Sequence, residues 1–279
     1  MLSEAEAWRF VRSLLGRTAQ SAACVELVDA RDGVIAWRAP FGATPEAERL
    51  LDLCLPLCVG ALARDLVVAH LGQSLDGRVA VPPGLPRLIT GAEDLRHTHR
   101  LRALSDAVVV GATTVAVDDP QLTTRLVPGE HPVRVVLDPH ARLPRDRALF
   151  TDGQAASLVV VGRRSAAAYA DVAGAEVVPL RLHGDTLSVD DVLAALRERG
   201  LRRIFVEGGG VTVSRFLDAG ALDRLHVAVA SRIVGTGVPA LQIRGAMFGG
   251  AASARSYLLG TDVLFDCDLR GGSAGRGLA

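Results

Sequence analysis

A run of three glycines behind a short apolar strand is the first feature of this sequence that could do chemistry. Residues 203–210 read Arg-Ile-Phe-Val-Glu-Gly-Gly-Gly, and a helical pattern continues over 211–217. Glycine lets a ligand approach the backbone closely, and a helix N-terminus offers unpaired N–H groups and the positive end of a dipole. The turn therefore fits a pyrophosphate, although a tight strand-to-helix turn that holds no ligand has the same pattern.

Glu207 is the last residue of that strand. In open α/β sheets, ligands bind at the carboxyl ends of the strands, so this carboxylate lies at the expected edge. It can accept N–H bonds from a heterocycle. It could equally cap the helix that follows, and the residue by itself leaves both interpretations open.

Two further loops would reach the same edge of a parallel sheet. One is Ser74-Leu-Asp-Gly-Arg78, which has good turn chemistry behind an apolar strand. The other covers 111–125, where a glycine and two threonines begin a short helix that Asp118, Asp119 and Pro120 end. The second loop supplies another helix N-terminus at this edge.

The cations available for an anionic ligand are arginines and histidines, because the 31 residues counted as Lys+Arg include no lysine. Arg163, Arg164 and Ser165 follow the strand 158–161, at a carboxyl end. Arginine offers charge and planar hydrogen bonds to a 2′-phosphate, and no acid occurs between 157 and 170 to hold the ribose hydroxyls of NAD. If this edge holds a nicotinamide cofactor, these residues favour one with a 2′-phosphate bound by Arg163; two solvated arginines at a helix start are the alternative.

These loops need a sheet to position them. From residue 65 onward, short runs rich in Val, Ile and Leu alternate with helical stretches, which predicts a mainly parallel sheet covered by helices. The last two runs, 253–259 and 261–269, are separated only by Gly260 and must form an antiparallel hairpin. Residues 1–64 are interpreted as an N-terminal extension of two helical segments with a short β-like run near 33–38. We expect the glycine-rich tail 271–279 to be disordered.

Composition narrows the classes of function. Hydrophobic residues make up 49% and charged residues 22% of the 279 residues, as in a folded globular protein. Zero net charge and 4% aromatic residues argue against nucleic acid or an anionic membrane as a partner. The four cysteines lack metal-ligand spacing, so no metal is implied. Because the N-terminus is an amphipathic helix and not a signal peptide, we expect a cytoplasmic protein.

Several motifs occur in one order along the chain: Ser74-Leu-Asp-Gly77, Leu101-Arg-Ala103, Thr114-Val-x-x-Asp118-Asp-Pro-x-Leu-Thr-x-Arg125, Val206-Glu-Gly-Gly209, and Leu222-Asp223 followed by Val234-Gly235-x-Gly237. As an ordered set they resemble the reductase domain of bacterial riboflavin biosynthesis, over residues 65–270. The resemblance implies an α/β fold like that of dihydrofolate reductase, with a mixed, mainly parallel sheet flanked by helices. It also implies a homodimer that uses NADPH to reduce a phosphoribosylamino-pyrimidine, with hydride transferred to the C1 imine or carbonyl carbon of the sugar.

The same resemblance implies two sets of site residues. One set would contact NADPH: Gln73, Thr114, Asp118, Gly209, Gly210, Val211 and Thr212. The other would surround the substrate: Arg102, Leu122, Arg125 and Glu207. The chemistry agrees in part, because two arginines can hold a phosphate and a carboxylate can accept the N–H bonds of a pyrimidine. The resemblance assigns no proton donor.

The sequence departs from the family pattern at three positions. His70 stands where the family usually has a lysine that helps hold the substrate, and Pro86 and Leu88 replace a serine and a tryptophan. Histidine is shorter than lysine and only partly charged near neutral pH. Two alternatives therefore stay open: an NADPH-dependent reductase of another small molecule in specialised metabolism, and a non-catalytic ligand-binding protein. The first 64 residues hold neither His-x-Glu nor Pro-Cys-x-x-Cys, so we expect no zinc deaminase domain there.

Overall fold

The structure is a computed structural model that describes residues 1–16, 25–31, 34–63, 65–80, 88–170, 172–243 and 253–270. The chain divides into two compact units, Met1–Leu66 and Val67–Ala279, and each is described by itself. Pro86 and the tail 271–279, which carried two of the sequence predictions, lie outside the described residues.

The first unit has four elements in chain order: helix α1 (Glu4–Ser13), strand β1 (Glu26–Arg31), strand β2 (Val34–Arg38) and helix α2 (Pro45–Ala63). Ser3 begins α1 with a capping box, in which its hydroxyl accepts from the Glu6 N–H and the Glu6 carboxylate accepts from the Ser3 N–H. The indole of Trp37 donates to Asp52 over 2.8 Å and so joins β2 to α2. Strand β2 confirms the β-like run expected near 33–38, and the structure adds β1, with which it pairs antiparallel.

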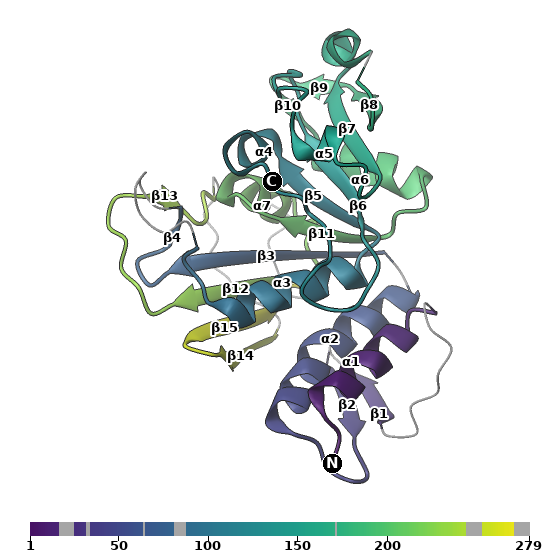
Figure 1. Ribbon diagram of the computed structural model, residues 1–279, viewed down its shortest axis with the longest axis vertical. Helices are drawn as coiled ribbons and strands as arrows, with labels where there is room; N and C mark the ends of the chain where they lie inside the picture. The colour runs from purple at the N-terminus through teal and green to yellow at the C-terminus, as the bar shows by residue number, and fades with distance from the viewer. Residues whose placement is uncertain are drawn as a thin grey trace, which may run out of the picture. The chain divides into compact units, whose positions relative to one another are not determined.

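A nine-stranded sheet forms the centre of the second unit, in the order β14-β15-β12-β3-β11-β5-β6-β7-β8 (Figure 1). Its strands are β3 (Leu66–Ser74), β5 (Ala107–Gly111), β6 (Val133–Leu137), β7 (Ser157–Gly162), β8 (Glu176–Leu180), β11 (Arg203–Glu207), β12 (Arg224–Ala230), β14 (Ser253–Leu259) and β15 (Asp262–Asp268). The pairs from β11 through β8 and the pair of β3 with β12 are parallel. Strands β12, β15 and β14 pair antiparallel, which confirms the closing hairpin.

Helices connect and cover these strands: α3 (Ala92–Leu104), α4 (Ala112–Asp118), α5 (Ala148–Thr151), α6 (Val189–Glu198) and α7 (Gly210–Asp218), with a 3₁₀ helix η1 (Arg163–Tyr169) after β7. Two small strand pairs complete the unit: β4 (Arg78–Ala80) with β13 (Val238–Pro239), and β9 (Leu182–His183) with β10 (Thr186–Leu187). The mixed, mainly parallel sheet flanked by helices confirms the expected fold class.

The two faces of the sheet differ in chemistry. Alternate residues of β3, Val67, Ala69 and Leu71, join an apolar core with Val213 and Phe216 of α7. Strand residues point alternately to opposite faces, so the residues between them face the other way. That second face lies under α3, which Figure 1 shows running along β3 and β12, and it carries the buried His70 and His226 besides apolar residues.

Candidate active site

The turns after β3 and β11 meet at one edge of the sheet. Ala240 donates its N–H to the Gly77 carbonyl over 2.9 Å, and a Cβ on Gly210 would lie 1.9 Å from the Ala240 oxygen. The segment that contains Ala240 therefore lies against both turns. Such close backbone contact explains why residue 210 has to be a glycine.

Asp76 fixes this segment to the turn after β3. Its carboxylate accepts from the Ser74 hydroxyl over 2.6 Å and from the N–H groups of Val234 and Gly235 over 3.0 and 2.7 Å. These bonds lower the pKa of Asp76 well below its ordinary value, the hydroxyl contributing most and the two N–H groups next. The motifs at 74–77 and 234–237, far apart in sequence, are thus bonded to each other. We call residues 232–242 the strap.

The glycine turn adopts a backbone that other residues avoid. Gly208 and Gly209 have φ values of +112° and +65°. A Cβ on Gly209 would lie 2.9 Å from the Thr114 hydroxyl, and a Cβ on Gly111 would lie 2.7 Å from the Thr212 hydroxyl. The N-termini of α4 and α7 therefore lie side by side, and neither N-cap glycine supplies a side-chain cap. Both helix starts present N–H groups and positive dipole ends to one small region.

Glu207 is held by Arg102 from helix α3. The guanidinium donates to both carboxylate oxygens, with 2.7 Å for the Nε bond, and donates a further bond of 2.9 Å to the Thr123 carbonyl. Burial would lower the pKa of Arg102, but the Glu207 carboxylate outweighs burial and raises that pKa. Sequence reasoning placed Arg102 and Glu207 separately; the structure makes them one bidentate unit.

Arg125 lies beside this pair and stays exposed. One guanidinium nitrogen donates to the Thr123 hydroxyl over 2.6 Å, so Thr123 contacts both site arginines. Leu122, which precedes it, is buried and has a φ of +56°, an uncommon value for a residue other than glycine. Its side chain belongs to the interior, and its bent backbone turns Thr123 toward the arginines.

His99 is a residue that the sequence analysis missed. It is buried, and its Nδ1 accepts the Arg125 N–H over 2.9 Å, which holds the loop that carries Arg125. Burial, followed by the charges of Arg102 and Arg125, lowers its pKa to about 4, so the ring is neutral. The spacing in the sequence could have indicated a place in the site, since His99 and Arg102 are three residues apart and lie on the same face of helix α3.

The other predicted cofactor residues lie at the same edge but differ in exposure. Val211 and Asp118 are exposed at the start of α7 and the end of α4, whereas Gln73 is half-buried in β3. Asp119, in a left-handed backbone with φ +41°, ends α4 and accepts the Ala148 N–H at the start of α5. Asp118 is thus left exposed while its neighbour performs the structural task.

Arg163 is exposed at the start of η1, at the carboxyl end of β7. In the sheet order β7 is separated from β11 by β5 and β6. Arg163, predicted to bind the 2′-phosphate, is therefore separated by these two strands from the glycine turn predicted to bind the pyrophosphate. The loop after β6 lies between them and touches β7, since Gly162 donates to the Pro139 carbonyl over 2.9 Å. An extended dinucleotide would have to cross this loop.

His70 and Leu88, two departures from the family pattern, have opposite environments. His70 is buried in β3, where its Nε2 lies 2.8 Å from the Asp94 carboxylate. Leu88 is 61% exposed and packs no aromatic wall against the site. Among the residues that the structure describes, no group of three or more His, Cys, Asp and Glu side chains could hold a metal ion.

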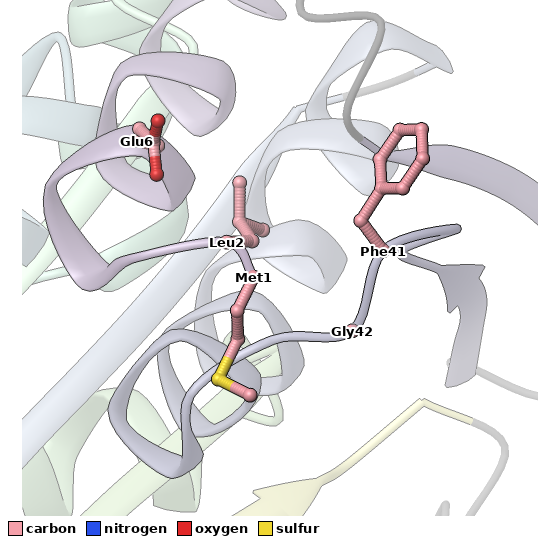
Figure 2. A pocket seen from close by; sticks show the side chains of 5 residues that line it. All are labelled: Met1, Leu2, Glu6, Phe41 and Gly42. Atoms are coloured by element: carbon pink, nitrogen blue, oxygen red, sulfur yellow. The ribbon is translucent and has the colours of Figure 1, made fainter.

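The first unit has a small pocket of its own, lined by Met1, Leu2, Glu6, Phe41 and Gly42 (Figure 2). Its lining combines apolar side chains with polar groups, among them the Glu6 carboxylate. None of the sequence-predicted site residues lies there. No helix in the described part of the chain has the length and apolar character needed to cross a membrane.

Comparison with known proteins decides the family of the second unit. Residues 65–252 match the model of the RibD C-terminal domain. The chain belongs to this family. A relative from Methanothermobacter thermautotrophicus, named 2,5-diamino-6-ribosylamino-4(3H)-pyrimidinone 5′-phosphate reductase, is 34% identical over 75% of this chain and 100% of its own length.

Bacterial family members extend beyond the matched region. The riboflavin biosynthesis protein RibD of Aquifex aeolicus is 33% identical, and the match covers 63% of this chain and 49% of that protein. The chain thus matches about half the length of that relative. A solved deaminase and 5-amino-6-(5-phosphoribosylamino)uracil reductase from Thermotoga maritima has a TM-score of 0.61 and 25% identity, over 81% of this chain and 63% of that one.

Proposed function

We propose that this protein is an NADPH-dependent reductase that acts on a phosphoribosylamino-pyrimidine in riboflavin biosynthesis. The observation that supports it best is the Arg102–Glu207 pair, directly before the glycine turn and beside Arg125. A fixed carboxylate that can accept N–H bonds, an exposed cation and a backbone cradle at one edge suit a substrate with a heterocycle and a phosphate. The name and full-length match of the archaeal relative support the same activity.

The glycine turn fits the cofactor. Two uncapped helix N-termini, close enough that Thr114 and Thr212 leave no room for Cβ atoms on the facing glycines, form a cradle for a pyrophosphate. Gly209, Gly210, Val211 and Thr212 would hold it from α7, and Thr114 and Asp118 from α4. Gln73 would contact the nicotinamide end and Arg163 the 2′-phosphate. The bound nicotinamide would supply a hydride to the C1 imine or carbonyl carbon of the sugar.

The residues around the substrate have separate tasks in this proposal. Glu207 accepts N–H bonds from the pyrimidine, while Arg102 fixes the orientation of that carboxylate. Arg125 binds the phosphate as an exposed cation, positioned by Thr123 and His99. Their work is to place the acceptor carbon against the hydride donor and to exclude water.

A reductase of another small molecule is the second candidate, because His70 and the exposed Leu88 change the walls of the substrate region. The test is the rate of NADPH oxidation with the phosphorylated pyrimidine and with its dephosphorylated form. Turnover of the phosphorylated form alone supports riboflavin biosynthesis. Turnover of neither, with tight NADPH binding, favours the second candidate, and failure to bind NADPH contradicts both.

We further propose a cytoplasmic homodimer. Strand β14 is an edge of the sheet, and Leu258 and Phe265 of the closing hairpin are 66% and 43% exposed. An edge strand with unpaired backbone groups and exposed apolar side chains beside it is a surface to which a second copy can bind. Sedimentation at micromolar concentration is expected to give twice the chain mass of 29.3 kDa. A mass of one chain would contradict the proposal.

A further inference from the structure

A buried cluster of three histidines lies between α3 and the sheet. His70 of β3 and His226 of β12 are register partners on adjacent strands, and His97 of α3 covers them. The His97 and His226 rings are stacked at 5.1 Å, with 2.9 Å between Nε2 and Nδ1, and the His70 ring is 5.7 Å from His97. A buried polar cluster of this size is costly unless its groups are paired.

His70 is the member of the cluster that carries charge. Burial alone would lower its pKa, but the charge and hydrogen bond of Asp94, 2.8 Å away, outweigh burial and raise it, with a smaller contribution from Glu207. Asp94 is itself buried, and its pKa stays below the ordinary value because His70 stabilises the carboxylate against burial. His70 and Asp94 thus form a buried ion pair.

The other two rings are neutral. Burial lowers the pKa of His97 well below its usual range, and the charges of His226, His70 and Arg100 lower it further. Burial also outweighs Asp266 at His226 and lowers that pKa. His97 Nδ1 is buried and has no hydrogen-bond partner among the residues that the structure describes. An extra proton on either ring would repel His70, so the cluster keeps its single positive charge beside Asp94.

His70 is also the histidine of the cluster whose pKa the Glu207 carboxylate helps to raise. Strand β3 lies next to β11 in the sheet, and the charge of Glu207 acts on His70. The other ionisable groups of the site are unsuited to give up a proton. Both carboxylate oxygens of Glu207 accept bonds from Arg102, both guanidinium groups are too basic to release a proton, and His99 Nδ1 accepts a backbone N–H.

We propose that His70, oriented and kept charged by Asp94, donates the proton that completes the reduction. This inference rests on the proposed function. The acceptor carbon gains a hydride with its electron pair, and the C=O or C=N π pair becomes a lone pair on oxygen or nitrogen. That atom takes the proton from Nδ1 of His70, the nitrogen that does not face Asp94. NADPH is oxidised by two electrons, the sugar carbon is reduced by two, and neutral His70 regains a proton from solvent.

The first test is His70→Gln, which keeps a donor toward Asp94 but carries no transferable proton. We expect kcat to fall by about 10²- to 10⁴-fold, the usual share of general acid catalysis, with the Kd for NADPH unchanged. His183→Gln is the control, because it removes the histidine of an exposed His–Asp pair on β9 and should leave kcat unchanged. An undiminished kcat in folded His70→Gln protein overturns the inference.

The second test separates proton donation from structural support. In unmodified protein, kcat should fall as pH rises through the raised pKa of His70, and Asp94→Asn should move this fall to lower pH by about 1 unit or more. The NMR signal of the His70 ring can be assigned because it is missing from the spectrum of His70→Gln. Titration of that signal without substrate should show the same lowering of the His70 pKa in Asp94→Asn. A ring that titrates below 6.5 overturns the inference even in an active enzyme. Unmodified protein that does not reduce the phosphorylated pyrimidine with NADPH overturns the proposed function and this step with it.

Discussion

At the scale of single residues, two arginines that look equivalent in the sequence do different work. Arg102 is buried, and its guanidinium donates to protein groups, the Glu207 carboxylate and the Thr123 carbonyl. Arg125 is exposed, and one of its guanidinium nitrogens donates a hydrogen bond to the Thr123 hydroxyl. We therefore assign orientation of Glu207 to Arg102 and capture of an anion to Arg125.

The difference predicts opposite effects of the two alanine variants. Arg102→Ala leaves a largely buried carboxylate unpaired and should lower the free energy of unfolding by about 3–5 kcal/mol. Arg125→Ala should change stability little and raise the KM of the phosphorylated substrate by about 10-fold or more. Urea denaturation and steady-state kinetics measure the two effects. Equal loss of stability in both variants would refute this assignment.

Arg163 carries the second prediction at this scale. Removal of one charge-assisted contact to a 2′-phosphate costs about 1.5–3 kcal/mol. Arg163→Ala should therefore weaken NADPH binding by about 10-fold or more and leave NADH binding nearly unchanged. Because Arg163 is exposed, the variant should fold normally. Calorimetric titration with both nucleotides measures this, and equal losses for the two would place the preference elsewhere.

At the scale of elements, the N-terminus of α7 is the part of the site easiest to test without disturbing the backbone. Gly209 is unsuitable, since a side chain there would meet both a φ of +65° and the Thr114 hydroxyl. Val211 is 46% exposed in the first turn of the helix. An acid at that position stabilises a helix by about 0.3–1 kcal/mol through the dipole.

Val211→Asp is therefore expected to keep or raise stability while it repels a bound pyrophosphate. Val211→Asn is the matched control, with the same shape and no charge. We expect the Kd for NADPH to be about 10-fold higher in the aspartate variant than in the asparagine variant, because a nearby like charge costs more than about 1.4 kcal/mol. The same Kd in both would show that the pyrophosphate does not bind at α7.

The strap is the other element whose position matters. Asp76 holds it at Val234 and Gly235, Ala240 holds it at Gly77, and the Gln242 N–H donates to the Ser214 hydroxyl of α7 over 2.7 Å. These contacts tie the turn after β3 to the start of α7. The strap thus fixes the distance between the two turns that would enclose the nicotinamide.

At the scale of the whole molecule, buried neutral histidines should make the protein sensitive to acid. His97, His99 and His226 have lowered pKa values in the folded state, so the unfolded chain binds more protons below the ordinary value of 6.5. Stability therefore falls as pH drops through 6.5. His70 has a raised pKa, so its contribution is complete below 6.5 and is lost only as pH rises through the raised value.

We expect each of the three neutral histidines to lower the free energy of unfolding by about 1 kcal/mol between pH 6.5 and 5.5. Urea denaturation at pH 7.5, 6.5 and 5.5 measures the change. His99→Gln, which removes one of the three, should reduce the drop by about 1 kcal/mol. A pH-independent midpoint over this range would mean that the rings are already protonated in the folded protein.

Local pattern alone determined most of the elements. Apolar runs marked the strands, a single glycine between 253–259 and 261–269 required a hairpin, and the glycine turn after Glu207 began a helix as expected. The family resemblance came from motifs in order along the chain. These features depend on residues close together in sequence, where steric and hydrogen-bonding preferences act directly.

Only the tertiary structure decided which side chains act together. Arg102 and Glu207 are 105 residues apart, and the His97 and His226 nitrogens that meet are 129 apart. Their contact depends on the strand order β12-β3-β11 and on how α3 docks on that face, and no local preference specifies either. The sequence showed that His70 departs from the family pattern, but burial beside Asp94 is what makes it a charged group, because charge in the interior depends on the nearest partner.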